Sequence, residues 1–298
     1  MRTIAVAAPA KVNLVLRVGV RDESGYHQIE TLFCKLALAD EVRVTVDGAP
    51  DDALTCDGPA LPRDGLGPRD ANLAWRALIA YRTATGWPGP SQIAVHKRIP
   101  VGGGLGGGSA DAAGVLRALD TLAPAPIGTA GLLSIGATLG ADVPFLVSDA
   151  VLAWAWGRGD RLLALPALPA RDLVLVPHAE GVHTASAYRW LAEAGGGTAR
   201  GARGYALDDV TSWSAVARAA HNDFTAVVRA RHTGVNGTLA ALEAAAAAAR
   251  AAGVADAFAL MSGSGATCLL VGADAPAELP QAVRTRSAEG VVGASRDS

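Results

Sequence analysis

Residues 96–119 read HKRIPVGGGLGGGSADAAGVLRAL, and the rest of the chain is best approached from this stretch. An alternating apolar segment at residues 92–99 comes first, six glycines and one serine follow among residues 102–111, and residues 115–119 have helical apolar spacing. This order predicts a strand, a glycine loop and a helix. Such a loop lets the backbone approach a ligand closely and ends at the partly positive N-terminus of a helix. The stretch therefore favours a bound phosphate.

The two standard phosphate fingerprints do not fit this loop. Gly102, Gly104 and Gly107 match G-x-G-x-x-G, but a dinucleotide site also needs an acidic residue about twenty positions further on, after a second strand. Residues 121–128 read TLAPAPIG there, which is typical of a turn. A P-loop would close with Gly-Lys-Ser/Thr, whereas this loop closes with Gly-Ser-Ala-Asp. A flexible linker would not lead directly from a strand into an amphipathic helix, for which we predict Ser109 as the N-cap.

The loop resembles the phosphate loop of the GHMP kinases, in which a proline precedes a Gly-Leu step and a serine. The triple glycines on both sides of Leu105 are most similar to those of the 4-diphosphocytidyl-2-C-methyl-D-erythritol kinases. Lys97 and the helix that begins near Asn72 lie in the neighbourhood that this family uses for adenine. By this resemblance the expected ATP-binding residues are Lys97, Pro100, Gly102, Gly103, Gly104, Leu105, Gly106, Gly107, Gly108, Ser109 and Ala110.

Length, charge and cysteine count argue against several classes of protein. A length of 298 residues predicts one large or two medium domains, and a net charge of −2 argues against a general nucleic-acid binder. The sequence holds no uncharged apolar stretch of about 18 residues, so no membrane partner is expected. Cys34, Cys56 and Cys268 are isolated and odd in number, which supports neither a disulfide framework nor a cysteine metal site. We expect a cytoplasmic protein, a monomer or homodimer, acting on a small molecule.

Patterning along the chain predicts an α+β fold. Pro-punctuated residues 165–170 are the best boundary, which gives domains at residues 1–167 and 168–298. A Gly/Arg-rich loop is expected at residues 195–204. Strands are predicted at residues 3–8, 12–20, 31–38, 41–46, 92–99, 145–147, 151–156, 173–176, 257–261 and 267–271, and helices at residues 72–83, 115–119, 129–139, 186–194, 225–228, 238–252 and 276–285.

Lys11 is predicted to lie in a turn between the first two apolar strands. A half-buried ammonium group there needs an anionic partner, although a lone lysine could equally mark an exposed strand end. The context Pro9-Ala-Lys-Val-Asn13 resembles the first GHMP motif. The resemblance places Lys11 at the catalytic centre and Asn13 beside it, on the substrate side.

Asp142 stands in the otherwise apolar run LGADVPFLV, just after a predicted helix end. A carboxylate among apolar neighbours is costly unless it is paired or used, and the residues alone leave a helix N-cap as an equal reading. The stretch GADVPF resembles the diphosphocytidyl-methylerythritol kinases, and that resemblance implies that Asp142 is the general base. Lys11 would keep its carboxylate ionised and stabilise the developing alkoxide.

Aromatic residues from both halves of the chain resemble the family's base-binding residues. Gly-Tyr26-His27 is similar to a motif whose rings face the cytosine of the substrate, although alone it reads as a strand-edge aromatic and a surface histidine. Thr184 and Tyr188 resemble a second motif, whose aromatic residue stacks on the other face of the base. His183 stands where that motif often has serine.

The turn SGSGAT at residues 262–267 alone predicts only a hairpin, but it resembles the third GHMP motif. That resemblance adds Gly263 and Ser264 to the expected substrate-side residues. Asn222-Asp223-Phe224 resembles a further family element that we interpret as structural.

Together these motifs imply a two-domain GHMP kinase fold, with an N-terminal domain like ribosomal protein S5 domain 2 and a ferredoxin-like C-terminal domain. They imply transfer of a phosphoryl group from ATP to the 2-hydroxyl of a cytidine diphosphate-linked methylerythritol, in the non-mevalonate route to isoprenoid precursors. Mg²⁺ should accompany ATP, with the Ser109 hydroxyl as its candidate ligand. Kinases of homoserine or of mevalonate derivatives, the related decarboxylases and a catalytically silent sensor are the alternatives. Lys11 with Asp142 argues against the sensor, and the aromatic residues argue against the smaller substrates.

Overall fold

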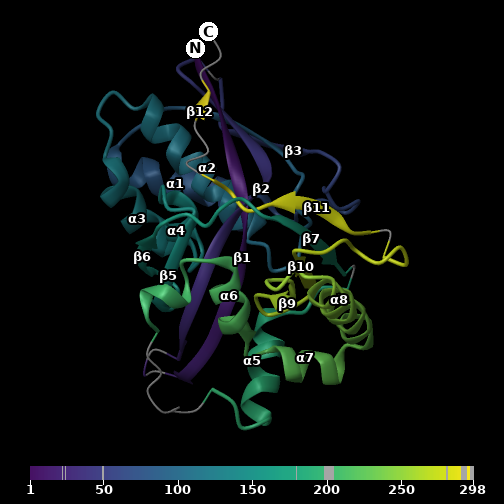
Figure 1. The fold of residues 1–298 in the computed structure, drawn as a ribbon. Coiled ribbons are helices and arrows are strands. Elements are labelled where there is room, and N and C mark those ends of the chain that lie inside the picture. Colours follow the sequence, from purple (N-terminus) through teal and green to yellow (C-terminus); the bar gives the residue numbers. More distant parts are fainter. Residues whose placement is uncertain are drawn as a thin grey trace.

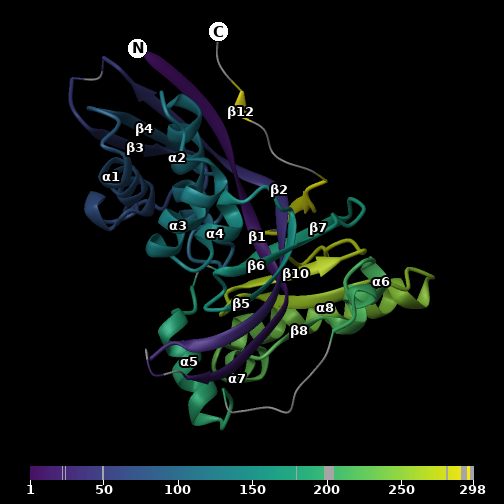
Figure 2. The same cartoon turned by 90° about the vertical axis from the view of Figure 1, so that its left-hand side faces the viewer.

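The computed structural model describes residues 1–298 except 22, 24, 49, 179, 198–204, 280, 290–293 and 296–298. Most of the Gly/Arg-rich loop expected at residues 195–204 therefore lies outside the described residues. Two sheets organise the chain, one of eight strands and one of four, with helices packed against both. Figures 1 and 2 show two long strands running through the molecule from one end to the other.

These two strands are β1 (Arg2–Arg21) and β2 (His27–Val46), paired in an antiparallel hairpin. The sequence predicted four shorter strands with Lys11 in a turn, and this is wrong: the chain stays extended throughout. The pairing register instead shifts between Pro9 and Lys11 and again between Asn13 and Val15. Such bulges bend a strand and turn a side chain out of its regular alternation. The bulges therefore replace the predicted turn at the position where the functional side chains lie.

The eight-stranded sheet is built outward from this hairpin. β2 pairs with a different neighbour along each half of its length, and two short strands from late in the chain pair with β1. The other members of the sheet are β3 (Ala53–Asp57), β4 (Gln92–His96), β5 (Leu152–Gly157), β6 (Arg161–Leu165), β8 (His221–Asn222) and β12 (Ala294–Ser295).

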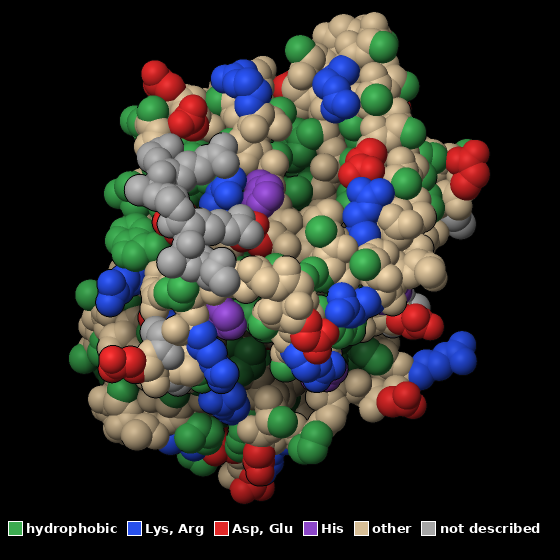
Figure 3. Space-filling view, turned by 90° about the horizontal axis from the view of Figure 1, so that it is seen from below, with side chains coloured by type: hydrophobic (Ala, Val, Ile, Leu, Met, Phe, Trp, Pro, Cys, Tyr) green, Lys and Arg blue, Asp and Glu red, His purple; other side chains and the backbone are tan. Residues whose placement is uncertain are grey.

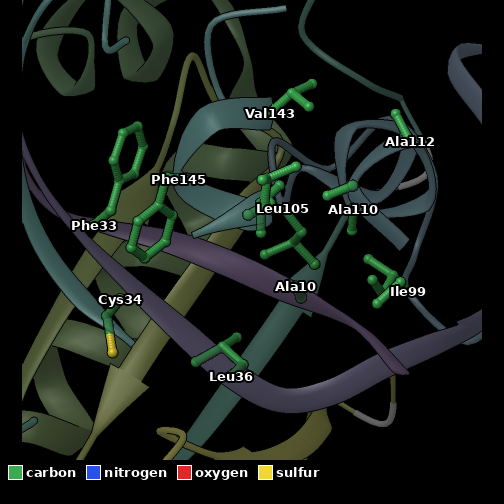
Figure 4. Packing of buried hydrophobic residues seen from close by; sticks show 14 of the residues in the cluster. Ala10, Phe33, Cys34, Leu36, Ile99, Leu105, Ala110, Ala112, Val143 and Phe145 are labelled. Carbon is green, nitrogen blue, oxygen red and sulfur yellow. The ribbon is translucent and has the colours of Figure 1, made fainter. Parts of the chain in front are cut away.

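Helices cover one face of this sheet, with α2 against both long strands. Figure 4 shows Leu105, Ile99 and Ala110 together in the core beneath the glycine loop. The predicted strand at residues 145–147 is wrong, because residues 143–147 form a short helix. The elements are η1 (Arg69–Ala71), α1 (Leu73–Thr85), α2 (Gly107–Leu122), α3 (Gly128–Leu139) and α4 (Val143–Val147).

The four-stranded antiparallel sheet is formed by the second half of the chain in the order β11-β7-β10-β9. Helix α8 packs on β9 and β10 and buries a second apolar cluster. The final helix predicted at residues 276–285 is wrong: the chain turns there and then forms β11. The elements are β7 (Asp172–Pro177), α5 (Thr184–Glu193), η2 (Leu207–Asp209), α6 (Trp213–Ala219), α7 (Thr225–Arg231), α8 (Thr233–Ala251), β9 (Phe258–Ser262), β10 (Thr267–Val271) and β11 (Val283–Arg286).

The boundary near residue 167 stays a prediction. The four-stranded sheet lies wholly after it, yet β8 and β12 return to pair with β1 in the other sheet. Among the described residues, every helix is too short or too polar to cross a membrane. On the face seen from below, Lys and Arg side chains are interspersed with Asp and Glu (Figure 3), unlike the one-signed surface that a nucleic acid binds.

Candidate active site

Lys11 and Asp142 meet at the bulged part of β1. The Lys11 Nζ lies 3.3 Å from Asp142 Oδ2 and donates to Asn13 Oδ1 at 2.8 Å. Asn13 Nδ2 in turn donates to the Thr31 hydroxyl at 2.8 Å. Lys11 and Asn13 are buried, whereas the Asp142 side chain keeps 30% of its surface exposed. The chain of polar contacts thus fixes a buried ammonium group beside a carboxylate that a ligand can reach.

Asp142 occupies the N-cap position of α4, but its side chain makes no capping hydrogen bond. The carboxylate faces Lys11 instead, so the reading of Asp142 as a structural cap is not supported. Lys35, which sequence analysis missed, supports this helix from its other end. Its buried ammonium group donates to the carbonyl oxygens of Leu146 (3.2 Å) and Ser148 (2.6 Å), and burial lowers its pKa to about 7.

The glycine loop contacts two segments, β1 and the turn after β9. The Lys11 backbone N–H donates to the Leu105 carbonyl at 2.9 Å, because the bulge frees this group from the β1–β2 ladder. Gly104 and Gly106 both have φ of +74°, a conformation that favours glycine. A Cβ on Gly104 would lie 3.1 Å from the Ser262 carbonyl oxygen, so the third motif packs directly against the loop.

Helix α2 begins at Gly107, with Gly106 as its N-cap and no side-chain capping bond. The predicted N-cap role of Ser109 is therefore wrong: it lies inside the first turn. The helix starts one turn earlier than serine capping would place it, because glycine at position 106 adopts the left-handed conformation. The first N–H groups of α2 are consequently left for a ligand, as an anion site requires.

A cavity of about 230 Å³ lies on one side of the loop. The start of α1 and the segment before it form the opposite wall, as the resemblance placed the adenine neighbourhood. Ala110 is buried beneath the loop and Ser109 faces the other way, so neither contributes to this cavity. Its lining is Leu66, Ala71, Asn72, Leu73, Lys97, Pro100, Val101, Gly102, Gly103, Gly104, Leu105, Gly106, Gly107, Gly108 and Asp111.

Lys97 lines this cavity, which we call the nucleotide-side cavity, and belongs to a buried charge cluster. Its Nζ donates to Asp40 Oδ2 at 2.5 Å and to Asp111 Oδ2 at 2.6 Å, and all three residues are at most 2% exposed. Burial raises the pKa of Asp111 to about 7; Lys97 opposes the rise and Asp40 adds to it. The Asp111 Oδ1 atom is buried without a hydrogen-bond partner among the described residues. Asp111 was missed as a candidate, although its place one turn into α2 was a usable signal.

A second cavity, of about 350 Å³, lies on the other side of the loop and contains the Lys11–Asp142 pair. Predicted substrate-side residues from both halves of the chain converge here. The lining is Lys11, Asn13, Leu16, Ile29, Phe33, Gly104, Gly106, Ser109, Ala141, Asp142, Arg158, Thr184, Tyr188, Phe224, Gly263 and Ser264. We call it the acceptor cavity.

Two of the predicted base-binding residues, His27 and Tyr188, contact each other. His27 and Tyr188, far apart in sequence, stack with ring centroids 4.9 Å apart. Burial, with a contribution from the Asp142 charge, raises the pKa of Tyr188 to about 12. The His27 Nδ1 lies 3.0 Å from the Gly19 carbonyl oxygen, which favours a proton on Nδ1 and leaves Nε2 as an acceptor in the neutral ring. Neither His27 nor Tyr26 is part of the cavity lining. Tyr26 is 56% exposed and lies under Arg158.

The third motif is held in place by side chains from the second half. Thr184 Oγ1 and Ser264 Oγ lie 3.0 Å apart. Asn222 Nδ2 donates to the carbonyl oxygens of Met261 (2.7 Å) and Gly263 (2.8 Å). These contacts agree with a structural role for Asn222. Through them the turn brings Gly263 and Ser264 to the wall of the acceptor cavity.

Within the described ranges, no group of three or more His, Cys, Asp or Glu side chains could hold a metal ion. Mg²⁺ at a nucleotide site does not need such a group, since it commonly takes one or two protein oxygens and otherwise phosphates and waters. Ser109 lies in the first turn of α2, lines the same cavity as Asp142 and has a hydroxyl suited to that kind of site.

Comparisons with known proteins agree with this geometry. The family model described as GHMP kinases N terminal domain matches residues 72–149. A protein of Deinococcus radiodurans named 4-diphosphocytidyl-2-C-methyl-D-erythritol kinase is 40% identical over 277 residues, which cover 90% of this chain and 84% of that protein. A protein of the same name from Anaeromyxobacter sp. (strain K) is 44% identical over 198 residues, 65% of this chain and 60% of that protein.

Comparison with solved structures points to the same family and fold. A structure described as 4-(cytidine 5'-diphospho)-2C-methyl-D-erythritol kinase is 32% identical with a TM-score of 0.72, and the match covers 96% of this chain and 100% of that one. A homoserine kinase from Cytophaga hutchinsonii, 17% identical with a TM-score of 0.66 over 99% of this chain and 97% of that one, shares the fold. The expected α+β GHMP kinase fold is confirmed. On these matches, the chain belongs to the 4-diphosphocytidyl-2-C-methyl-D-erythritol kinases within the GHMP kinase family.

Proposed function

We propose that this chain transfers the γ-phosphoryl group of ATP to the 2-hydroxyl of 4-diphosphocytidyl-2-C-methyl-D-erythritol, a step of the non-mevalonate (MEP) pathway to isoprenoid precursors. The observation that carries the proposal is the pair of cavities on opposite sides of one glycine loop. Gly104 and Gly106 line both cavities, and the Lys11–Asp142 pair lies on the acceptor side. A phosphate held by the loop would therefore be adjacent to the carboxylate that could activate an alcohol.

The chemistry follows from the charges beside the loop. Asp142 takes the proton of the attacking hydroxyl, since its side chain is accessible and makes no capping bond. Lys11 stabilises the alkoxide as negative charge develops. Because Lys11 is buried and fixed by Asn13, it stabilises this charge with little reorganisation. Phosphoryl transfer needs mainly positioning and charge stabilisation, which these groups supply.

The glycine loop and the start of α2 bind the phosphates of ATP through backbone N–H groups. Ser109 is the residue that we propose as the protein ligand of Mg²⁺. When bound, the ion would neutralise charge on the phosphates during transfer. The nucleotide base and ribose lie toward Asn72 and Leu73, on the far wall of the 230 Å³ cavity.

The cytosine end of the acceptor binds at His27 and Tyr188. Their direct stacking in the structure supports a shared aromatic site, in which a base would displace one ring from the other. The His27 Nε2 would accept a hydrogen bond from the exocyclic amine of cytosine. Tyr26 would have to approach from its exposed position to contribute its ring.

One copy of the chain supplies both cavities, so we propose that a monomer is catalytically complete, whether or not two copies associate. Cys34, Cys56 and Cys268 are all unpaired, which is usual for proteins of a reducing compartment. This supports the proposal that the enzyme works in the cytoplasm.

The direct test is an ADP-release assay in which the purified protein, ATP and Mg²⁺ are presented with a panel of alcohols. We expect turnover of 4-diphosphocytidyl-2-C-methyl-D-erythritol and at least 100-fold lower kcat/KM for homoserine and mevalonate, which lack the base for the aromatic site. Comparable turnover of a small alcohol with none of the cytidine compound would overturn the proposed substrate while leaving kinase chemistry in place.

A further inference from the structure

Charge in the acceptor cavity is unevenly balanced. Of its lining residues, Lys11 and Asp142 form an ion pair at 3.3 Å, which largely cancels their charges. Arg158 is the remaining charged side chain in the described lining. The cavity therefore carries a net positive charge from a residue that no sequence motif singled out.

Arg158 has only weak charge compensation. The contact to Asp160 joins Arg158 Nη2 and Asp160 Oδ2 at 3.8 Å, with the two side chains 43% and 25% exposed. An ion pair at that distance and exposure contributes little and leaves the guanidinium available to another anion. The guanidinium carbon lies 5.0 Å from the centroid of the Tyr26 ring, which holds the group over an aromatic face without neutralising it.

The turn that carries Arg158 is closely fitted to the catalytic segment. Gly157 and Gly159, on either side of Arg158, have φ of +72° and +101°. The Arg158 N–H donates to Asp160 Oδ1 at 3.1 Å, and the Gly159 N–H donates to the Trp156 carbonyl at 3.1 Å. A Cβ on Gly159 would lie 3.2 Å from Ile29 Cδ1 and 3.8 Å from the carbonyl oxygen of Ala141. The turn thus packs beside the residue that precedes Asp142, which fixes where the arginine can reach.

We propose that Arg158 binds the diphosphate group of the acceptor and makes the enzyme selective for acceptors that carry one. This inference rests on the proposed function. An acceptor with its hydroxyl at Asp142 and its base at His27 and Tyr188 must place its diphosphate between these ends, within the cavity that Arg158 lines. A guanidinium suits this task because its N–H groups can bind two phosphate oxygens at once.

The test compares the binding of CDP and cytidine by calorimetry, because the two ligands share the base and differ in the diphosphate. For the unaltered protein we expect CDP to bind more tightly than cytidine. In Arg158→Ala this preference should fall about 10- to 100-fold while cytidine affinity stays the same, since only a charge-assisted hydrogen bond to phosphate is lost. Arg158→Lys should recover part of the preference. Arg161→Ala, on the exposed start of β6, removes the same charge nearby and should leave the preference intact.

Steady-state kinetics add an independent readout. Arg158→Ala should raise the KM for the diphosphate-bearing acceptor by a similar factor and leave the KM for ATP unchanged, since Arg158 does not line the nucleotide-side cavity. An Arg158→Ala protein that keeps the full CDP preference and acceptor KM would overturn the role of Arg158 alone. Failure of the unaltered protein to phosphorylate the cytidine compound would instead overturn the proposed function, and with it the diphosphate site.

Discussion

The Asp111 side chain occupies the most unusual electrostatic position near the nucleotide-side cavity. It shares one lysine, Lys97, with a second buried carboxylate, Asp40, and has one oxygen without a partner among the described residues. Asp40 has more hydrogen-bond partners, because the backbone N–H groups of Arg98 and Ile99 also donate to its carboxylate. When both carboxyl groups are ionised the cluster has a net negative charge in a buried site, and burial therefore favours a proton on Asp111.

This predicts a pH-dependent effect of Asp111→Asn on stability. The pKa of Asp111 is raised to about 7 in the folded protein, against about 4 when unfolded. The stability that this carboxyl contributes is therefore fully present below about pH 4 and is lost as the pH rises through about 7. Between pH 5 and pH 7, the free energy of unfolding of Asp111→Asn should rise relative to the unaltered protein by up to about 1.4 kcal/mol per pH unit. Urea unfolding at pH 5, 6 and 7 measures this difference, and a pH-independent difference would contradict the assignment.

Among the elements, the junction of the glycine loop with α2 is the proposed phosphate site. Most glycines of the loop cannot test this cleanly, because a side chain on Gly103, Gly104 or Gly106 would meet neighbouring atoms or a left-handed backbone. Gly108 is different: it lines the nucleotide-side cavity, and a Cβ there would meet only Leu73 Cδ1, at 3.7 Å.

We therefore predict that Gly108→Val weakens ATP binding by at least about 10-fold and leaves the folded structure intact, since the added side chain blocks the approach of phosphate to the first turn of α2. Calorimetry with ATP and thermal unfolding measure the two effects. Gly237→Val in α8 is the matched control, because a Cβ at Gly237 has no neighbour within 4 Å. ATP affinity equal in both variants would mean that the phosphates bind elsewhere.

The sequence predicted α3 and the β9–β10 hairpin well, because each has a clear apolar period and a glycine or turn signal at its end. It predicted a helix after the glycine loop but started α2 too late, because Ser109 resembles an N-cap. Two shorter strands were predicted in place of each of β1 and β2. In β1, Pro9 and the polar residues after it resemble a turn, whereas a bulge accommodates them within one strand. Residues 145–147 are apolar for too short a stretch to separate a buried strand from a buried helix. β8 and β12, two residues each, depend wholly on tertiary pairing with β1.

The structure brings to one cavity seven residues that the resemblance placed at the catalytic centre or the substrate: Lys11, Asn13, Asp142, Thr184, Tyr188, Gly263 and Ser264. Tyr26 and His27 were expected with them and are not among the residues of its lining. Lys35, Asp111 and Arg158 were missed because their roles arise from burial and from neighbours distant in sequence. Lys35, for example, supports α4 across more than a hundred residues. A single sequence gives no local pattern for such contacts.

For the whole molecule, the long β1–β2 hairpin connects the two halves and carries Lys11 at a bulge, while Asp142, the other member of the proposed catalytic pair, comes from the start of α4. The glycine loop contacts it from one side through Leu105, and the turn after β9 reaches it from the other, where the Asn13 N–H lies 3.4 Å from the Ser262 hydroxyl oxygen. Asn222, in β8, donates a hydrogen bond to the Met261 carbonyl just before that turn, and β8 itself pairs with β1. The acceptor cavity is therefore assembled from residues of both halves of the chain.

The most direct test of the account is the rate of phosphoryl transfer in a single turnover of Asp142→Asn with ATP, Mg²⁺ and the cytidine-linked alcohol. We predict a transfer rate lower by about 10²- to 10⁴-fold, the usual contribution of a general base, with ATP affinity close to that of the unaltered protein. Asparagine keeps the size of the side chain and removes its ability to accept the proton. A variant that transfers the phosphoryl group at more than about a tenth of the unaltered rate would contradict the role of Asp142 and the catalytic centre built around it.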